Sequence, residues 1–220
     1  MDKLKIEFRR RALPSESIND SHYSFLEGVS ELDSPWNLGK LETLADIGSD
    51  LTLSVSLNKA LGRGLKGDLV YTYRGSEYIR DTAQYDDNIF IEFSPDKISL
   101  ETIINILRVY VPAFNCYKVV VHNWAIVRTD WPSIVERCED SGKDVNGRDG
   151  VYRINAINYF DRELCQRAFN LSPEQIIERL DGKVESVSLL HDGVLLIYSS
   201  KYLERDKLEK IDSEIRPLLA

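Results

Sequence analysis

The chain has 220 residues, of which 43% are hydrophobic and 29% charged, a composition typical of a folded globular protein and not of a disordered one. Its 36 acidic and 28 basic residues give a formal net charge of −8, which opposes direct binding to nucleic acid. The sequence has no signal peptide and no apolar run of the roughly 18 residues that a membrane-spanning helix needs. We therefore expect a cytoplasmic protein, away from membranes, folded as a single compact domain over 1–220 or as sub-lobes at 1–80 and 81–220.

The first part of the chain predicts strands and helices in alternation. Polar and apolar residues alternate over 5–8, which predicts a strand, and Arg9-Arg10-Arg11 predicts that this strand ends in solvent. Apolar residues at helical spacing predict an amphipathic helix over 17–32. Further strands are expected at 51–57 and 69–73, separated by a short helical stretch that glycines interrupt.

The middle of the chain predicts a strand–helix–strand unit. A β-branched and aromatic strand is expected at 89–93, and Ser94-Pro95-Asp96 supplies the cap of a helix that runs to about Val111 and is stopped by Pro112. A strand at 117–122 completes the unit. A parallel pair with a right-handed crossover is the natural arrangement, and an antiparallel sheet with flanking helices stays an alternative.

The last part of the chain predicts capped helices and a β-hairpin. The expected elements are a helix over 131–138 capped by Asp130, a loop over 139–150, a strand over 151–157, helices over 162–169 and 173–180, strands over 184–190 and 194–199, and a closing helix over 204–219. Asp161 and Ser172 are the expected caps of two of these helices, and Asp192-Gly193 is a favoured hairpin turn. The hairpin requires antiparallel pairing. We therefore predict an α+β fold with a mixed, largely antiparallel β-sheet flanked by helices, a C-terminal β-hairpin and a closing helix.

No arrangement of residues in the sequence specifies catalysis. The three histidines lie in separate elements and not at metal-ligand spacing, and no phosphate-binding loop or nucleophile elbow is present. Cys116, Cys138 and Cys165 are isolated, which predicts free thiols. We expect no catalytic residue, no metal site, no cofactor and no enzymatic activity, while an enzyme with dispersed catalytic residues, a hydrolase or a transferase, stays open as an alternative.

Two features favour binding to another protein. The segment 77–101 is rich in carboxylates, and such a surface steers a basic partner. Aromatic residues are dense around Trp124 and Trp131, and exposed aromatic side chains beside acids anchor interfaces. A solvated acidic face and buried tryptophans are the alternatives. The residues that we expect to contact a partner are Asp81, Tyr85, Asp86, Asp87, Glu92 and Trp124.

Three segments carry a resemblance to a known family: Gly150–Asn155, Phe160–Phe169 and Gly193–Ser200. In these segments, and in general over 119–220, the chain resembles the immunity protein 52 family of bacterial polymorphic toxin systems. The resemblance implies a cytoplasmic immunity protein that binds and neutralises a cognate nuclease effector, delivered by type VI secretion, through stoichiometric inhibition. The effector is then expected to present a basic surface, and an adaptor that loads an effector stays an alternative function.

Overall fold

The computed structural model describes residues 3–39, 41, 52–74 and 86–220 of the chain. The strands are β1 Leu4–Arg11, β2 Leu53–Ser56, β3 Leu65–Tyr71, β4 Asp86–Phe93, β5 Lys118–Asn123, β6 Ile157–Asp161, β7 Ser186–Leu190 and β8 Gly193–Ile197. The helices are α1 Ile18–Val29, α2 Asn58–Leu61, α4 Leu100–Phe114, α5 Trp124–Ser141, α6 Arg162–Phe169, α7 Pro173–Leu180 and α8 Arg205–Ile215, which a short 3-10 turn follows at Arg216–Leu218. None of these helices is long and apolar enough to cross a membrane.

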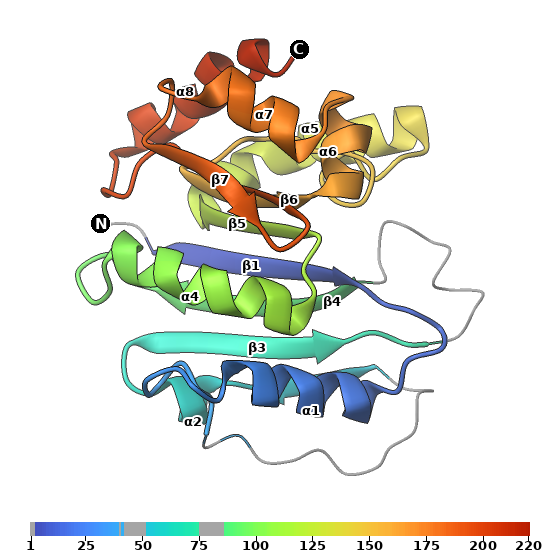
Figure 1. The fold of residues 1–220 in the computed structure, drawn as a ribbon, viewed down its shortest axis with the longest axis vertical. Helices are drawn as coiled ribbons and strands as arrows, with labels where there is room; N and C mark the ends of the chain where they lie inside the picture. The colour runs from blue at the N-terminus through green and yellow to red at the C-terminus, as the bar shows by residue number, and fades with distance from the viewer. Residues whose placement is uncertain (1–2, 40, 42–51, 75–85) are drawn as a thin grey trace.

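The strands form one eight-stranded sheet in the order β2-β3-β4-β1-β5-β6-β8-β7 (Figure 1). Every neighbouring pair is antiparallel. The predicted α+β class is confirmed, with its C-terminal hairpin and closing helix. The sheet continues across position 80, because β3 pairs with β4.

The first strand of the chain lies at the centre of the sheet. β1 pairs with β4 on one side and with β5 on the other. β4 and β5 run in the same direction, as a strand–helix–strand unit requires, but β1 occupies the position between them. The expected adjacent parallel pair is therefore wrong, since β1 supplies an antiparallel neighbour to both strands.

Helices cover the two faces of the sheet at different ends. α1 and α4 lie over β3, β4 and β1, while α5 to α8 gather at the other end (Figure 1). The larger apolar core includes Phe8, Phe25 and Tyr110, whose rings contact one another at centroid distances of 5.3–5.4 Å. A second core on the opposite face includes Phe160 and Leu196 and lies under α6, α7 and α8.

The middle helix differs from its prediction at both ends. Ser99 caps α4 by accepting a hydrogen bond from the Thr102 amide at 3.1 Å, and the expected cap, Ser94, instead closes a turn through its carbonyl. Pro112 does not stop the helix, because it lies in the last turn and the buried Phe114 beyond it packs in the core. The helix ends where Asn115 adopts the left-handed conformation, with φ 52°.

The region of α5 and the segment after it also differ from prediction. Asn123, not Asp130, caps α5, by accepting a hydrogen bond from the Ala125 amide at 2.8 Å. The strand expected over 151–157 is wrong, since the structure has a strand only from Ile157 onward. The Ile154 amide donates to the Asp212 carboxylate at 2.8 Å, so a side chain replaces the neighbouring strand as its partner.

The elements after residue 160 match their predictions closely. Asp161 caps α6 through the Leu164 amide at 2.7 Å, and Ser172 and Gln175 form a capping box at α7. β7 and β8 pair as the expected hairpin. The expected Asp192-Gly193 turn is wrong, since Gly193 already pairs with Leu190 and the two turn residues are His191, with φ 53°, and Asp192. Local chemistry explains the agreement at the caps, because each cap is set by residues adjacent in sequence.

Replacing Gly193 by Ala should destabilise the pairing of β8 with β6. A Cβ at this position would lie 2.1 Å from the Phe160 carbonyl oxygen, so the two paired strands would have to separate. We expect a loss of about 2–3 kcal/mol in the free energy of unfolding, measured by urea denaturation. Gly182→Ala is the matched control, since its positive φ costs about 1 kcal/mol but its added Cβ contacts nothing within 4 Å. Equal losses in the two variants would contradict the close packing of β6 and β8.

Candidate functional site

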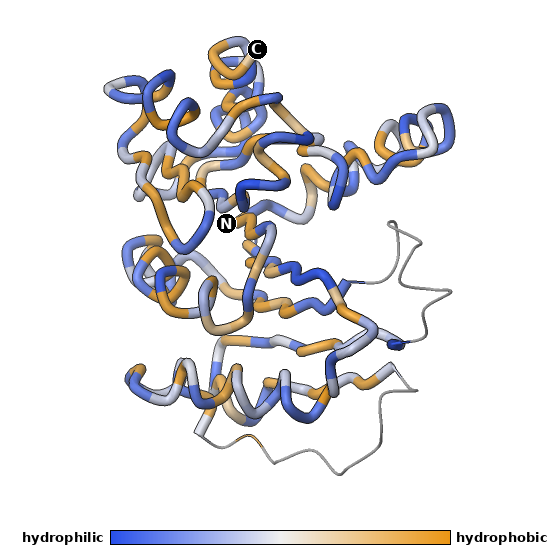
Figure 2. The backbone as a smooth tube through the Cα atoms, turned by 45° about the vertical axis from the view of Figure 1, so that its right-hand side comes forward, coloured by the Kyte–Doolittle hydropathy of each residue, from blue (hydrophilic) through white to orange (hydrophobic). Residues whose placement is uncertain are grey.

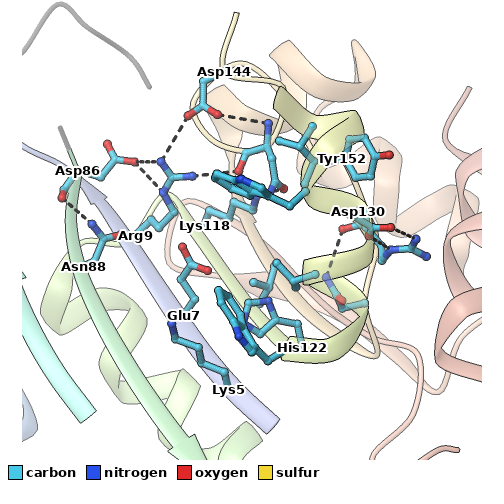
Figure 3. Close-up of a pocket in the computed structure, with 18 of the residues that line it drawn as sticks. Lys5, Glu7, Arg9, Asp86, Asn88, Lys118, His122, Asp130, Asp144 and Tyr152 are labelled. Atoms are coloured by element: carbon cyan, nitrogen blue, oxygen red, sulfur yellow. Dashed lines mark hydrogen bonds and ion pairs between the residues drawn. The ribbon is translucent and has the colours of Figure 1, made fainter. Parts of the chain in front are cut away.

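A cleft of about 670 Å³ lies between α5 and the sheet (Figure 3). Its floor is formed by side chains of β1, β4 and β5: Lys5, Glu7, Arg9, Asn88, Phe90, Lys118, Val120 and His122. Its wall is a stripe on α5: Trp124, Val127, Trp131, Ile134, Val135 and Cys138. The volume falls within the range of about 300–1,000 Å³ that is typical of ligand sites.

Strand alternation explains the polar floor. Leu4, Ile6 and Phe8 of β1 are buried in the core under α1 and α4, so Lys5 and Glu7 between them face the opposite side. Among the described residues, no helices form an apolar core over this side of β1, in contrast to α6, α7 and α8 over β6 and β8. The charged residues of the central strand therefore line an open cleft and not a second apolar core.

Helix α5 is packed much less tightly than the other long helices. Of its 18 residues only Ile126 and Ile134 are buried, and its end projects from the rest of the chain (Figure 2). Trp124 and Trp131 are 50% and 58% exposed. Exposed large apolar side chains that cluster beside a cleft are typical of an interaction site.

Asp86 closes one end of the cleft with a dense set of hydrogen bonds. Its carboxylate accepts from Arg9 Nε at 2.8 Å, from Arg148 Nε at 2.6 Å and from the Tyr117 hydroxyl. Burial raises the pKa of Tyr117 well above its ordinary value, so the phenol stays protonated and remains a donor. Arg9 also contacts Asp144 at 3.4 Å, which connects β1 and β4 to the loop after α5.

Asp87 forms a second buried site on the other face of the sheet. It accepts from Arg74 through both carboxylate oxygens at 2.7 Å, from Arg10 Nη1 at 3.2 Å and from the Thr72 amide at 2.9 Å. The side chains of Asp87 and Arg74 are no more than 1% exposed. Two arginines and one backbone amide thus satisfy this carboxylate inside the protein.

These contacts correct two sequence-based predictions. Asp86 and Asp87 were expected on an acidic surface that contacts a partner, but both are buried and neutralised by arginines of the same chain. Arg9-Arg10-Arg11 was expected to end a strand in solvent, but its members pair with Asp86, Asp87 and Asp161. The sequence could not reveal this pairing, because partners distant along the chain make it.

The other expected contact residues have different positions. Asp81 and Tyr85 lie outside the residues that the structure describes. Glu92 lies on β4, half-exposed, and pairs with Lys3 at 2.5 Å. Trp124 lines the cleft, and Asp86 also reaches it as the buried carboxylate at one end. Sequence reasoning missed the floor, although the alternation of Lys5, Glu7 and Arg9 with apolar residues was the available signal.

Two basic groups of the floor have lowered pKa values. Burial and the nearby Arg9 guanidinium lower the pKa of Lys118 to about 8, and its ammonium donates to the Asn146 carbonyl at 2.7 Å. Burial lowers the pKa of His122 to about 4, so its imidazole is neutral at pH 7. His122 Nε2 is buried and has no hydrogen-bond partner within the described part of the chain. A buried polar atom without a partner is unusual and is typical of a binding or catalytic position.

The described residues contain no group of three or more histidine, cysteine or carboxylate side chains that could hold a metal ion. Cys116, Cys138 and Cys165 are free thiols, as predicted. Burial raises the pKa of Cys165 to about 12 and that of Cys116 well above its ordinary value, so neither is an activated thiolate.

The fold and the cleft define an α+β protein whose antiparallel sheet leaves part of one face open beside a projecting helix. No family model matches the chain, and no curated protein matches it in sequence. Among solved structures it is similar to "Pseudomonas aeruginosa T6SS protein PA0821", with a TM-score of 0.56 and 10% identity over 99% of this chain and 74% of that chain. At this identity the likeness concerns the fold, so the family resemblance inferred from sequence stays a prediction.

Replacing Asp87 by Asn should destabilise the protein strongly. The change leaves the buried Arg74 and the nearby Arg10 without their carboxylate, and breaking a buried ion pair costs about 3–5 kcal/mol. Chemical denaturation of Glu92→Gln provides the control, because an exposed ion pair contributes only about 0–1 kcal/mol. Similar losses in both variants would show that Asp87 is not a buried structural anion.

The stability of the protein should fall in acid because of His122. Its pKa is about 4 in the folded chain and 6.5 when unperturbed, so protons bind preferentially to the unfolded state as the pH drops below about 6.5. Between pH 6.5 and 4 this residue should remove roughly 3 kcal/mol from the free energy of unfolding. His122→Gln should show a correspondingly shallower pH dependence, with the exposed His191→Gln as control. A slope equal to that of the wild type in His122→Gln would contradict a buried neutral imidazole.

Proposed function

We propose that this chain is a cytoplasmic immunity protein, which binds a cognate toxin effector one to one and blocks it without catalytic turnover. The observation that carries the proposal is the pair of exposed tryptophans on α5, Trp124 and Trp131, at the mouth of a cleft of about 670 Å³. Tryptophans that become buried on association are the commonest anchors of tight protein interfaces.

The fold likeness supports the same proposal. The similar structure is described as a T6SS protein, and the match covers almost the whole of this chain. The sequence resemblance to the immunity protein 52 family points to the same class of secretion system. Together they support an effector–immunity pair, in which the toxin acts in the compartment where its inhibitor is made.

A nuclease is the proposed class of effector. Nucleases present cationic surfaces to phosphate, and this chain carries a net charge of −8. The acidic residues Asp86 and Asp87 do not contribute to this attraction, since internal arginines neutralise them. Long-range steering then depends on exposed carboxylates elsewhere, including Glu136, Glu139 and Asp140 at the projecting end of α5.

A second candidate function is a hydrolase or transferase that uses the cleft. Glu7, Lys118 and His122 converge there, and this convergence is the observation that favours an enzyme. The pKa of His122 near 4 argues for the binding function, because a general base works best with a pKa close to the operating pH. An enzyme would lose its turnover in Glu7→Gln and His122→Gln, whereas an inhibitor would show only changed affinity.

Co-expression tests the proposal directly. If a toxin gene lies in the adjacent reading frame, cells that express that toxin should survive only when this chain is also present, and the purified pair should form an equimolar complex. An adaptor would form the complex with the effector but would not protect the cells from it. Failure to form any complex would exclude both binding functions.

Replacing Trp131 by Ala should weaken the complex roughly 10- to 100-fold, because it removes a large apolar anchor from the mouth of the cleft. Isothermal titration calorimetry against the purified effector measures the change. Leu189→Ala is the control, since Leu189 is similarly exposed, at 56%, but lies on β7 away from the cleft. Weakening by Leu189→Ala with no effect of Trp131→Ala would place the interface on another surface.

A further inference from the structure

The cations that line the cleft all have partners within the protein. Arg9 pairs with Asp86 and Asp144, and Lys118 donates to the carbonyl and side-chain oxygens of Asn146 at 2.7 and 2.9 Å. Lys5 lies over the rings of Phe90 and Trp124, with its ammonium 3.9 and 4.9 Å from the ring centroids. The hydrogen bonds and ring contacts of these three cations are therefore made within the floor and walls, and the Glu7 carboxylate attracts Arg9 and Lys118 without a hydrogen bond.

Two hydrogen-bond acceptors of the cleft, the Glu7 carboxylate and Nε2 of His122, have no donor within the described residues. Figure 3 shows Glu7 and His122 at the same end of the cleft. The two lie on adjacent strands, where Lys5 pairs with His122 and Glu7 pairs with Val120. The unmet hydrogen-bonding capacity of the cleft is thus an anionic acceptor beside a neutral imidazole.

The wall above these acceptors is apolar and aromatic. Trp124, Val127 and Trp131 follow one another on the side of α5 that faces the floor. A guanidinium group matches such a site better than an ammonium group, because it is planar, stacks on aromatic rings and donates several hydrogen bonds in one plane. Its aliphatic stem adds apolar contact with the wall.

We propose that the cleft receives an arginine side chain of the partner protein, whose guanidinium donates to Glu7 and to His122 Nε2 while its stem packs against α5. This inference rests on the proposed function, since it names the chemistry by which the effector is recognised. It also gives a role to the buried Nε2 atom, which the arginine would satisfy. A nuclease surface that binds phosphate supplies such arginines.

A small guanidinium probe tests the cleft without the effector. Methylguanidinium chloride should shift the His122 side-chain nitrogen resonances and the tryptophan fluorescence in a saturable way, in the millimolar range expected for so few atoms. Bound guanidinium requires Nε2 as acceptor, so the His122 proton should lie on Nδ1. Sodium acetate at the same concentration should give no saturable shift. No saturation by methylguanidinium, or equal saturation by acetate, would overturn the proposal.

Glu7→Gln is the decisive variant, because it keeps the size of the side chain and removes its charge. It should abolish the methylguanidinium shift and weaken the effector complex at least tenfold, with a shallower salt dependence, since hydrogen bonds to charged groups are the stronger ones. Glu92→Gln, on the neighbouring strand and paired with Lys3, should leave both within about twofold. Thermal unfolding of Glu7→Gln should stay close to that of the wild type, because the carboxylate loses no internal hydrogen bond and only its attraction to the nearby Arg9 and Lys118 charges is removed.

The two measurements separate the two proposals. Effector binding that Glu7→Gln leaves unchanged would overturn the arginine proposal and leave the immunity function standing. A wild-type chain that binds methylguanidinium through Glu7 but does not bind the effector would overturn the proposed function and keep the guanidinium site. A Glu7→Gln chain with a large loss of thermal stability would show that the Glu7 carboxylate holds the fold together, and would overturn its assignment as an acceptor for a partner.

Discussion

Three consecutive arginines on the central strand connect the parts of this protein that form its cleft. Arg9, Arg10 and Arg11 alternate between the two faces of the sheet and pair with Asp86, Asp87 and Asp161, which belong to β4 and to the end of β6. A buried charge is costly unless it is paired, so these contacts fix the position of β1 between its neighbours. The ring of Tyr117 lies between two of the arginines, with their guanidinium carbons 5.7 and 4.3 Å from its centroid. The loop after α5 is held by the same group of charges through Asp144 and Arg148.

The open face of the sheet follows from this arrangement. The C-terminal helices α6, α7 and α8 bury the face of β6 and β8, and their core does not extend over β1 and β4. α5 lies beside the face of β1 and β4 but buries only Ile126 and Ile134, so it does not cover that face. The chain therefore combines a firmly packed sheet with a loosely covered cleft. That combination suits a protein that binds, because the sheet fixes Glu7 and His122 while the wall keeps exposed surface for a partner.

The sequence predicted those features that depend on neighbouring residues. The caps at Asp161 and Ser172 and the hairpin between β7 and β8 follow from local chemistry, and the structure confirms them. The insertion of β1 between β4 and β5 was not predictable, since it depends on pairing between residues far apart in the chain. The same reason explains the failure for Asp86 and Asp87, whose surface role was inferred from composition although distant arginines bury them. Trp124 was found because the density of aromatic residues around it and Trp131 is visible in sequence, whereas the floor of the cleft comes from three strands.

The central claim is that the partner binds at the cleft between α5 and the sheet. Hydrogen–deuterium exchange of this chain, alone and in complex with the proposed effector, tests that claim most directly. We predict slower exchange in α5 and in the loop that follows it, since the partner would cover their exposed amides, and unchanged exchange in α1 and α4 on the opposite face. Protection confined to α1 and α4, with α5 exchanging as in the free chain, would contradict the account.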